Sequence, residues 1–235
     1  MKLSGIFGTG SGKAGSSVFV VRPGENIVRA YQPRVANPQT ARQTATRERL
    51  AFCSTLAKGL DDVLAIGMPQ RGLKSPRNAF VKTIIPLDSR VISQTSSTIR
   101  VEYTVLPVSK GGMPKPRVAT LATNTQAGFV SVTLAQPYIE TVGHYHYRKA
   151  GEAGLVIVLY NPTLGETSIK QLVDVADPDL AVNYPASWSG LEAQVYVFAK
   201  WVLKSGTIIE SGTIPWRYPS DQSDSVYCGS IRELL

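Results

Sequence analysis

Residues 87–235 form a succession of short β-type segments with no helical segment between them, and this pattern restricts the fold more than any other feature of the chain. The segments are rich in β-branched and aromatic residues, and clusters of Gly, Pro, Asn or Asp separate most of them. Closely spaced strands without intervening helices favour an antiparallel sandwich. The expected strands are 98–107, 117–123, 129–134, 144–148, 155–160, 168–173, 193–203, 207–214 and 225–231.

We therefore predict a mainly β chain whose C-terminal region, 87–235, is an immunoglobulin-like antiparallel β-sandwich. Residues 193–199 are apolar at nearly every position, as in a strand covered on both faces, and we expect a central strand there. The Gly-containing segments 124–128 and 204–206 are short enough to be hairpin loops between neighbouring strands.

A run of Gly, Ser and Lys at residues 8–17 is similar in composition to a phosphate-binding loop. Such a loop opens a helix, but here the β-branched segment 18–21 follows, and after a turn signal comes a second apolar segment, 27–31. The Walker spacing also fails, because Phe7 stands where Gly is required and Ala14 stands where Ser or Thr is required. We predict a basic, Gly/Ser-rich arm with a β-hairpin over residues 1–36, and no nucleotide cofactor.

The segment 37–86 is expected to be helical. A capping residue followed by Pro occurs at Asn37 and again at Ser75, which predicts a long helix over 39–66 and a short one ending at Ile85. The apolar residues that recur at three- and four-residue intervals are Ala41, Ala45, Phe52, Leu56, Leu60, Val63 and Leu64. The basic residues expected mainly on the other faces are Arg42, Arg47, Arg49 and Lys58.

Charge is distributed unevenly along the chain. The formal net charge is +8, but residues 1–100 carry 15 Lys and Arg against 5 Asp and Glu, whereas residues 101–235 carry 10 against 12. A basic N-terminal part suits contact with nucleic acid or with an acidic protein surface, although a solvated basic helix face explains the same charges. The 43% hydrophobic content suffices for a core, and we expect neither a signal peptide nor a transmembrane segment.

No residue pattern predicts catalysis or metal binding. His144 and His146 share a strand face but have no third ligand nearby, so a contact patch is favoured over a metal site. Cys53 and Cys228 are expected to be reduced thiols, with Cys53 packed on the helix. A solvated loop is favoured over a calcium site for the acidic residues Asp174, Asp177 and Asp179. A hydrolase-type nucleophile elbow is also absent from the sequence, and we predict a protein that is not an enzyme.

Six segments, in this order, resemble those of a family of unknown function found in gut Bacteroidota and their phages. They are 12–17, 28–33, 35–40, 108–114, 156–162 and 195–198. The resemblance spans nearly the whole chain, and the chain departs from the family pattern at 142–154 and 216–223. It implies an arm, a helical segment and an immunoglobulin-like sandwich, and the phage association suggests a virion component. The family supplies no catalytic residue to carry over.

The sequence thus favours a structural protein that enters a virion after synthesis in the cytoplasm and assembles through its N-terminal arm with other virion proteins, as a homo- or hetero-oligomer. A nucleic-acid-associated basic protein and a cell-surface adhesion module are the alternatives. The candidate interaction residues are Lys13, Arg22, Arg29, Tyr31, Arg34, Arg42, Arg47 and Arg49. No membrane partner, metal or cofactor is expected.

Overall fold

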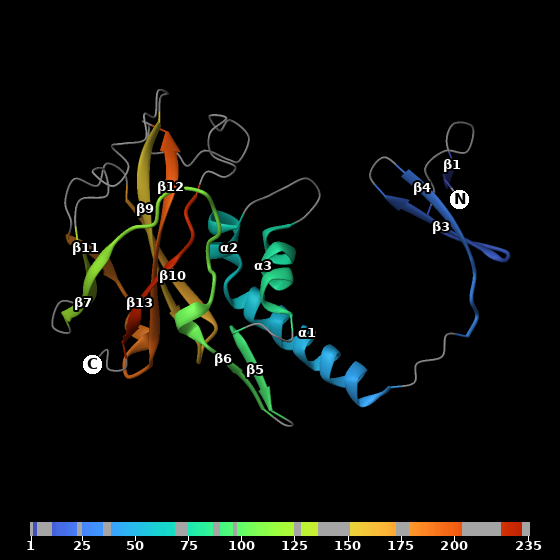
Figure 1. The fold of residues 1–235 in the computed structure, drawn as a ribbon, viewed down its shortest axis with the longest axis horizontal. Coiled ribbons are helices and arrows are strands. Elements are labelled where there is room, and N and C mark those ends of the chain that lie inside the picture. The colour runs from blue at the N-terminus through green and yellow to red at the C-terminus, as the bar shows by residue number, and fades with distance from the viewer. Residues whose placement is uncertain are drawn as a thin grey trace. The chain divides into compact units, whose positions relative to one another are not determined.

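The chain divides into two compact units, residues 1–44 and 45–235, in a computed structural model (Figure 1). The residues that the structure describes are 2–3, 11–22, 25–34, 39–68, 75–86, 90–95, 98–124, 128–135, 151–172, 179–203 and 222–231. This described part of the chain is mainly β, as predicted, with strands in four antiparallel sheets and three α-helices.

The N-terminal unit contains a four-stranded antiparallel sheet with the order β1-β4-β3-β2. Its strands are β1 (Lys2–Leu3), β2 (Gly12–Ala14), β3 (Ser17–Arg22) and β4 (Glu25–Ala30). The predicted hairpin is confirmed, since β3 pairs with β4 and Arg22 lies opposite Glu25. The glycine-rich run was expected to be part of an arm, but it also forms β2, an edge strand of this sheet. Gly15 follows that strand with a φ of +59°, a left-handed conformation that glycine adopts readily.

The second unit is built on a central antiparallel sheet with the order β10-β9-β12-β13. Its strands are β9 (Gly151–Asn161), β10 (Glu166–Leu172), β12 (Ala193–Leu203) and β13 (Val226–Ile231). The expectation that 193–199 forms a central strand is confirmed, because β12 lies between β9 and β13. Both faces are covered along 154–161 of β9 and 193–200 of β12, which explains their largely apolar sequences.

One face of the central sheet packs against a three-stranded sheet with the order β11-β8-β7. These strands are β7 (Val118–Asn124), β8 (Phe129–Leu134) and β11 (Asp179–Asn183). The predicted hairpin at 124–128 is confirmed by the pairing of Asn124 with Phe129. Buried side chains between the two sheets include Val130, Val132, Leu134, Leu155, Ile157, Leu159, Leu180, Val195 and Val197. This arrangement is a two-sheet sandwich in the second unit, and its immunoglobulin-like identity stays a prediction.

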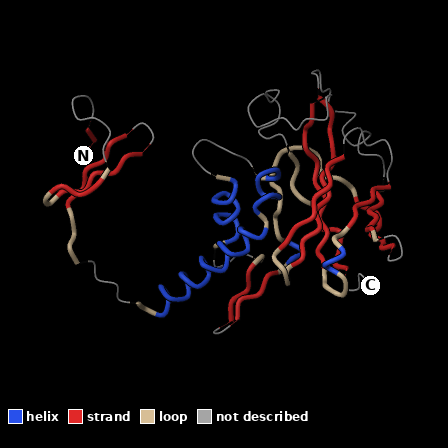
Figure 2. The backbone as a smooth tube through the Cα atoms, turned by 180° about the vertical axis from the view of Figure 1, so that it is seen from behind, coloured by secondary structure: helices blue, strands red, loops and turns tan. Residues whose placement is uncertain are grey.

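The other face of the central sheet is covered by helices, as Figures 1 and 2 show. The helices are α1 (Ala41–Gly59), α2 (Asp61–Gly67) and α3 (Pro76–Ile84). Successive residues of the central strands point to opposite faces of the sheet. One set therefore packs against the helices and the alternate set packs against the second sheet, which divides the core into two parts. Buried residues on the helical side include Cys53, Leu60, Leu64, Phe80, Ile84, Val156, Val158, Tyr196 and Phe198. The predicted helical segment is therefore a layer of the core.

Several predicted boundaries are wrong. The first helix begins at Ala41 rather than at Gln39, because Thr40 caps it: the Thr40 Oγ1 accepts a hydrogen bond from the Gln43 amide at 3.3 Å. Residues 35–38 lie outside the described residues. The predicted long helix is two helices, separated at Leu60. The second predicted helix is confirmed, with the Ser75 Oγ accepting from the Asn78 amide at 3.2 Å.

The strand predicted at 98–107 is shorter than expected, because β6 (Thr98–Val101) gives way to a 3-10 turn, η1 (Tyr103–Val105). Its partner, β5 (Ile92–Thr95), was not predicted, and neither was β11. The strands predicted at 144–148 and 207–214 and the loop at 204–206 lie outside the described residues. Within the described part of the chain, no helix is long and apolar enough to span a lipid bilayer.

Candidate interaction surfaces

Strand pairing sorts the residues of the N-terminal sheet onto two faces. Directly opposed residues in antiparallel strands share a face, and successive residues alternate between the faces. Phe19 pairs with Gly12 on one side and with Val28 on the other, so these three residues share one face. The described positions on this face are Leu3, Gly12, Ala14, Ser17, Phe19, Val21, Asn26, Val28 and Ala30. None of these residues is charged, and we call them the uncharged face.

The opposite face carries positive charge. Val18 pairs with Lys13 on β2 and with Arg29 on β4, which places both cations in one row across the sheet. The described positions on this face are Lys2, Lys13, Val18, Val20, Arg22, Glu25, Ile27 and Arg29. We call them the basic face. Sequence alternation alone does not separate the two faces, because 18–21 is apolar at every position; only the cross-strand register does so.

The sheet has no core of its own among the described residues. None of the described side chains in residues 11–34 is buried: those of β3 and β4 are half-buried or exposed, and Val21 is 42% exposed. A stable sheet of this size needs a second layer on at least one apolar face. The N-terminal unit therefore presents apolar surface that its own described residues do not cover.

Lys13 and Tyr31 are held together on the N-terminal unit. The Lys13 ammonium lies 3.6 Å from the centre of the Tyr31 ring, a cation–π contact. The Tyr31 amide donates a 2.7 Å hydrogen bond to the Ser16 carbonyl, which anchors the residue after β4 to the turn after β2. Tyr31 keeps 40% of its surface exposed. The structure therefore brings together Lys13 and Tyr31, two of the interaction residues predicted from the sequence.

Several of the other predicted interaction residues lie apart from this pair. Arg34 is exposed beyond β4, and Arg42 and Arg47 are exposed on α1. Arg22 ends β3. Arg49 is only 2% exposed, so the expectation that it lies away from the apolar face of the helix is wrong. Its Nη2 donates hydrogen bonds to two backbone carbonyls, which gives this side chain a structural role.

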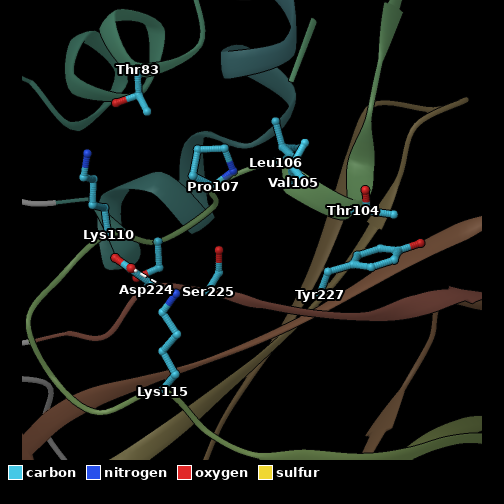
Figure 3. A pocket seen from close by; sticks show the side chains of 11 residues that line it. Thr83, Thr104, Val105, Leu106, Pro107, Lys110, Lys115, Asp224, Ser225 and Tyr227 are labelled. Carbon is cyan, nitrogen blue, oxygen red and sulfur yellow. Dashed lines mark ion pairs between the residues drawn. The ribbon is translucent and has the colours of Figure 1, made fainter. Parts of the chain in front are cut away.

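A separate hollow of about 230 Å³ opens on the second unit between α3, η1 and the start of β13 (Figure 3). Lys115 and Asp224 form an ion pair at 3.2 Å on its wall, and Asp224 also accepts from the Gly111 amide at 3.1 Å. Lys110, hydroxyl-bearing residues and the apolar segment Val105, Leu106 and Pro107 line the rest. These segments are far apart in sequence, and no sequence pattern linked them.

This hollow offers charge and hydrogen bonds to a small polar ligand. The residues that line it include neither His nor Cys. Burial, chiefly, raises the pKa of the lining Tyr227, whose hydroxyl donates to the Gln194 side chain at 2.8 Å, so the phenol stays protonated near neutral pH. The hollow therefore combines charged, polar and apolar groups around a small volume.

The described residues contain no group of three or more His, Cys, Asp or Glu side chains that could hold a metal ion. His144, His146, Asp174 and Asp177 lie outside the described residues. Asp179, which was expected in a loop, begins β11. Both cysteines are free thiols, and Cys53 is buried on α1, as predicted.

Comparison with known proteins adds no relative: no protein-family model matches the chain, and no curated protein matches its sequence.

Proposed function

We propose that this protein is a non-enzymatic structural component that assembles with other proteins through its N-terminal sheet. The observation that carries the proposal is the uncharged face, where Phe19, Val21 and Val28 lie together without a charged neighbour among the described positions. We propose that the protein assembles into a phage particle, as the family resemblance suggests. In that particle the second unit would be the rigid body of the protein.

Physical chemistry supports docking through this face. A protein with a net charge of +8 repels a second copy and any other basic partner. Contact through a surface without charged residues avoids the free-energy cost of removing charges from water. Val21 is 42% exposed, and covering it and its neighbours removes apolar surface from water. Small residues at Gly12, Ala14 and Ala30 flank the large ones, which allows another backbone to approach closely.

Adjacent valines on β3 allow a matched test. Val21→Lys places a charge on the uncharged face, whereas Val20→Lys adds the same charge to the basic face. Each variant is expressed in the host of the particle in place of the wild-type chain, and purified particles are analysed by quantitative mass spectrometry. We expect wild-type copy number for Val20→Lys and loss of the Val21→Lys chain from the particles. Circular dichroism of both purified chains checks that they fold.

A result in which both variants enter the particles at wild-type copy number contradicts assembly through the uncharged face. Absence of the wild-type chain from purified particles contradicts the virion assignment itself. Deletion of residues 1–36 provides a coarser version of the same test, and normal incorporation of that chain contradicts any role of the N-terminal arm in assembly.

A further inference from the structure

We propose that the basic face of the N-terminal sheet binds single-stranded nucleic acid. This surface is separate from the uncharged face, so the two contacts can be made at once and can fail independently. The proposal rests on the cation row of Lys13 and Arg29, on the exposed ring of Tyr31 and on the charge of the surrounding sequence.

The register sets the spacing of the cations. Lys13 and Arg29 lie on either side of Val18, two inter-strand steps apart, which is about 10 Å for strands of ordinary separation. A single strand that crosses the sheet can therefore place phosphates against both side chains. Val18 lies between the cations, and Val20 and Ile27 form the next row along the strands on the same face; all three are only half-buried and form an apolar floor for bases. Open sheets with this combination of cations and apolar or aromatic groups are typical binding surfaces for unpaired strands.

Tyr31 supplies the stacking group. The residue is 40% exposed, and the Lys13 ammonium lies 3.6 Å from the ring centre, on one side of it. The hydrogen bond from the Tyr31 amide to Ser16 fixes the backbone at this position. A base stacked on the exposed part of the ring would thus lie beside a cation that can contact its phosphate.

Charge complementarity selects a polyanion as the occupant. Residues 1–100 carry 15 basic and 5 acidic residues, and the register places Lys2, Lys13, Arg22 and Arg29 on the basic face with a single acidic residue, Glu25. At the far end of the hairpin Arg22 lies opposite Glu25, so their formal charges cancel. A second copy of this basic chain is disfavoured on the same surface, because like charges repel.

The test uses the full chain and fluorescence anisotropy with labelled oligothymidine and oligouridine of about 20 nucleotides, a duplex of the same length, and heparin, over a salt titration. We expect both single strands to bind at low salt and more tightly than the duplex. Lys13→Gln and Arg29→Gln should each weaken binding several-fold and reduce the magnitude of the salt slope by about 0.7, the value for one phosphate contact on a single strand. Arg29→Lys should retain the slope. Arg100→Gln removes an exposed strand cation outside this sheet and should change neither quantity.

Stacking is tested at Tyr31. Tyr31→Ala should lower affinity for both single strands about ten-fold and leave heparin binding unchanged, while Tyr31→Phe retains affinity because the ring remains. Failure of both oligonucleotides to bind at low salt overturns the proposal, as does binding that is insensitive to Lys13→Gln and Arg29→Gln. An equal loss of heparin and oligonucleotide binding in Tyr31→Ala indicates a simple polyanion site and also overturns it. Val21→Lys, which tests the proposed assembly, should bind the oligonucleotides as the wild type does.

Discussion

The guanidinium of Arg49, on α1, donates a 3.1 Å hydrogen bond to the backbone carbonyl of Ile92, on β5. The same Nη2 donates a 2.6 Å hydrogen bond to the Pro86 carbonyl, just beyond α3. Arg49 is 2% exposed, so one buried cation ties a helix to the end of another helix and to a strand. Neutral carbonyl oxygens accept these hydrogen bonds, and they replace part of the hydration that the charge loses on burial.

Arg49→Ala should destabilise the second unit by about 2–4 kcal/mol, because it leaves two carbonyls without their donor and opens a cavity. Lys58→Ala, an exposed residue later on the same helix, should stay within about 0.5 kcal/mol of wild type. Urea unfolding followed by circular dichroism measures both. An Arg49→Ala chain with wild-type stability contradicts this structural role.

Gly67 ends α2 where the chain segment at Val108 and Ser109 passes closely. A Cβ at position 67 would lie 2.6 Å from the Val108 carbonyl oxygen and 3.0 Å from the Ser109 Cβ. Gly67→Ala should therefore cost about 1–3 kcal/mol of unfolding free energy. Ala65→Ser, exposed on the same helix, is the control and should change stability by less than about 0.5 kcal/mol. Equal thermal midpoints for the two variants would show that the close approach does not constrain the fold.

Alkaline pH should destabilise the second unit through its buried tyrosines. Burial, with a smaller contribution from Tyr103, raises the pKa of Tyr160 from 10 to about 12. The protonated phenol therefore contributes stability that is complete below pH 10 and is lost as the pH rises towards 12. The loss for Tyr160 reaches about 1.4 kcal/mol by pH 11. Urea unfolding at pH 9 and pH 11 should show a smaller decrease in Tyr160→Phe than in wild type, and equal decreases would contradict the assignment.

The two thiols should react slowly in the native protein. Burial raises the pKa of Cys228 to about 12, and burial also raises that of Cys53 against the opposing effect of Arg49. Little thiolate is present at pH 8, and Cys53 is fully buried. A disulfide reagent such as DTNB should modify both cysteines within seconds in denaturant and much more slowly without it. Single Cys→Ser variants assign the two phases, and rapid native labelling of Cys53 would contradict its burial.

Local sequence signals predicted those elements that depend on neighbouring residues. The β3–β4 hairpin follows from two apolar runs around a turn, and α3 follows from Ser75 and Pro76 at its start. Predictions failed where an equally good local signal competed. Thr40 caps α1, although the sequence offers more than one residue that can accept from a helix amide, and only the path of the chain selects among them. The strand β5 was missed because its sequence, ISQT, has a weaker β pattern than that of its partner β6, TIRV.

The sequence by itself determined that this chain is mainly β with helices near its start, because periodicity and turn residues act over a few positions. Only the tertiary structure decided which faces those elements present. The register of β2, β3 and β4 separates Lys13 and Arg29 from Phe19, although the apolar run around Phe19 has no alternation to show it. The burial of Arg49 likewise depends on carbonyls about 40 residues away, whose positions are set by packing of α1 and α3 on the central sheet.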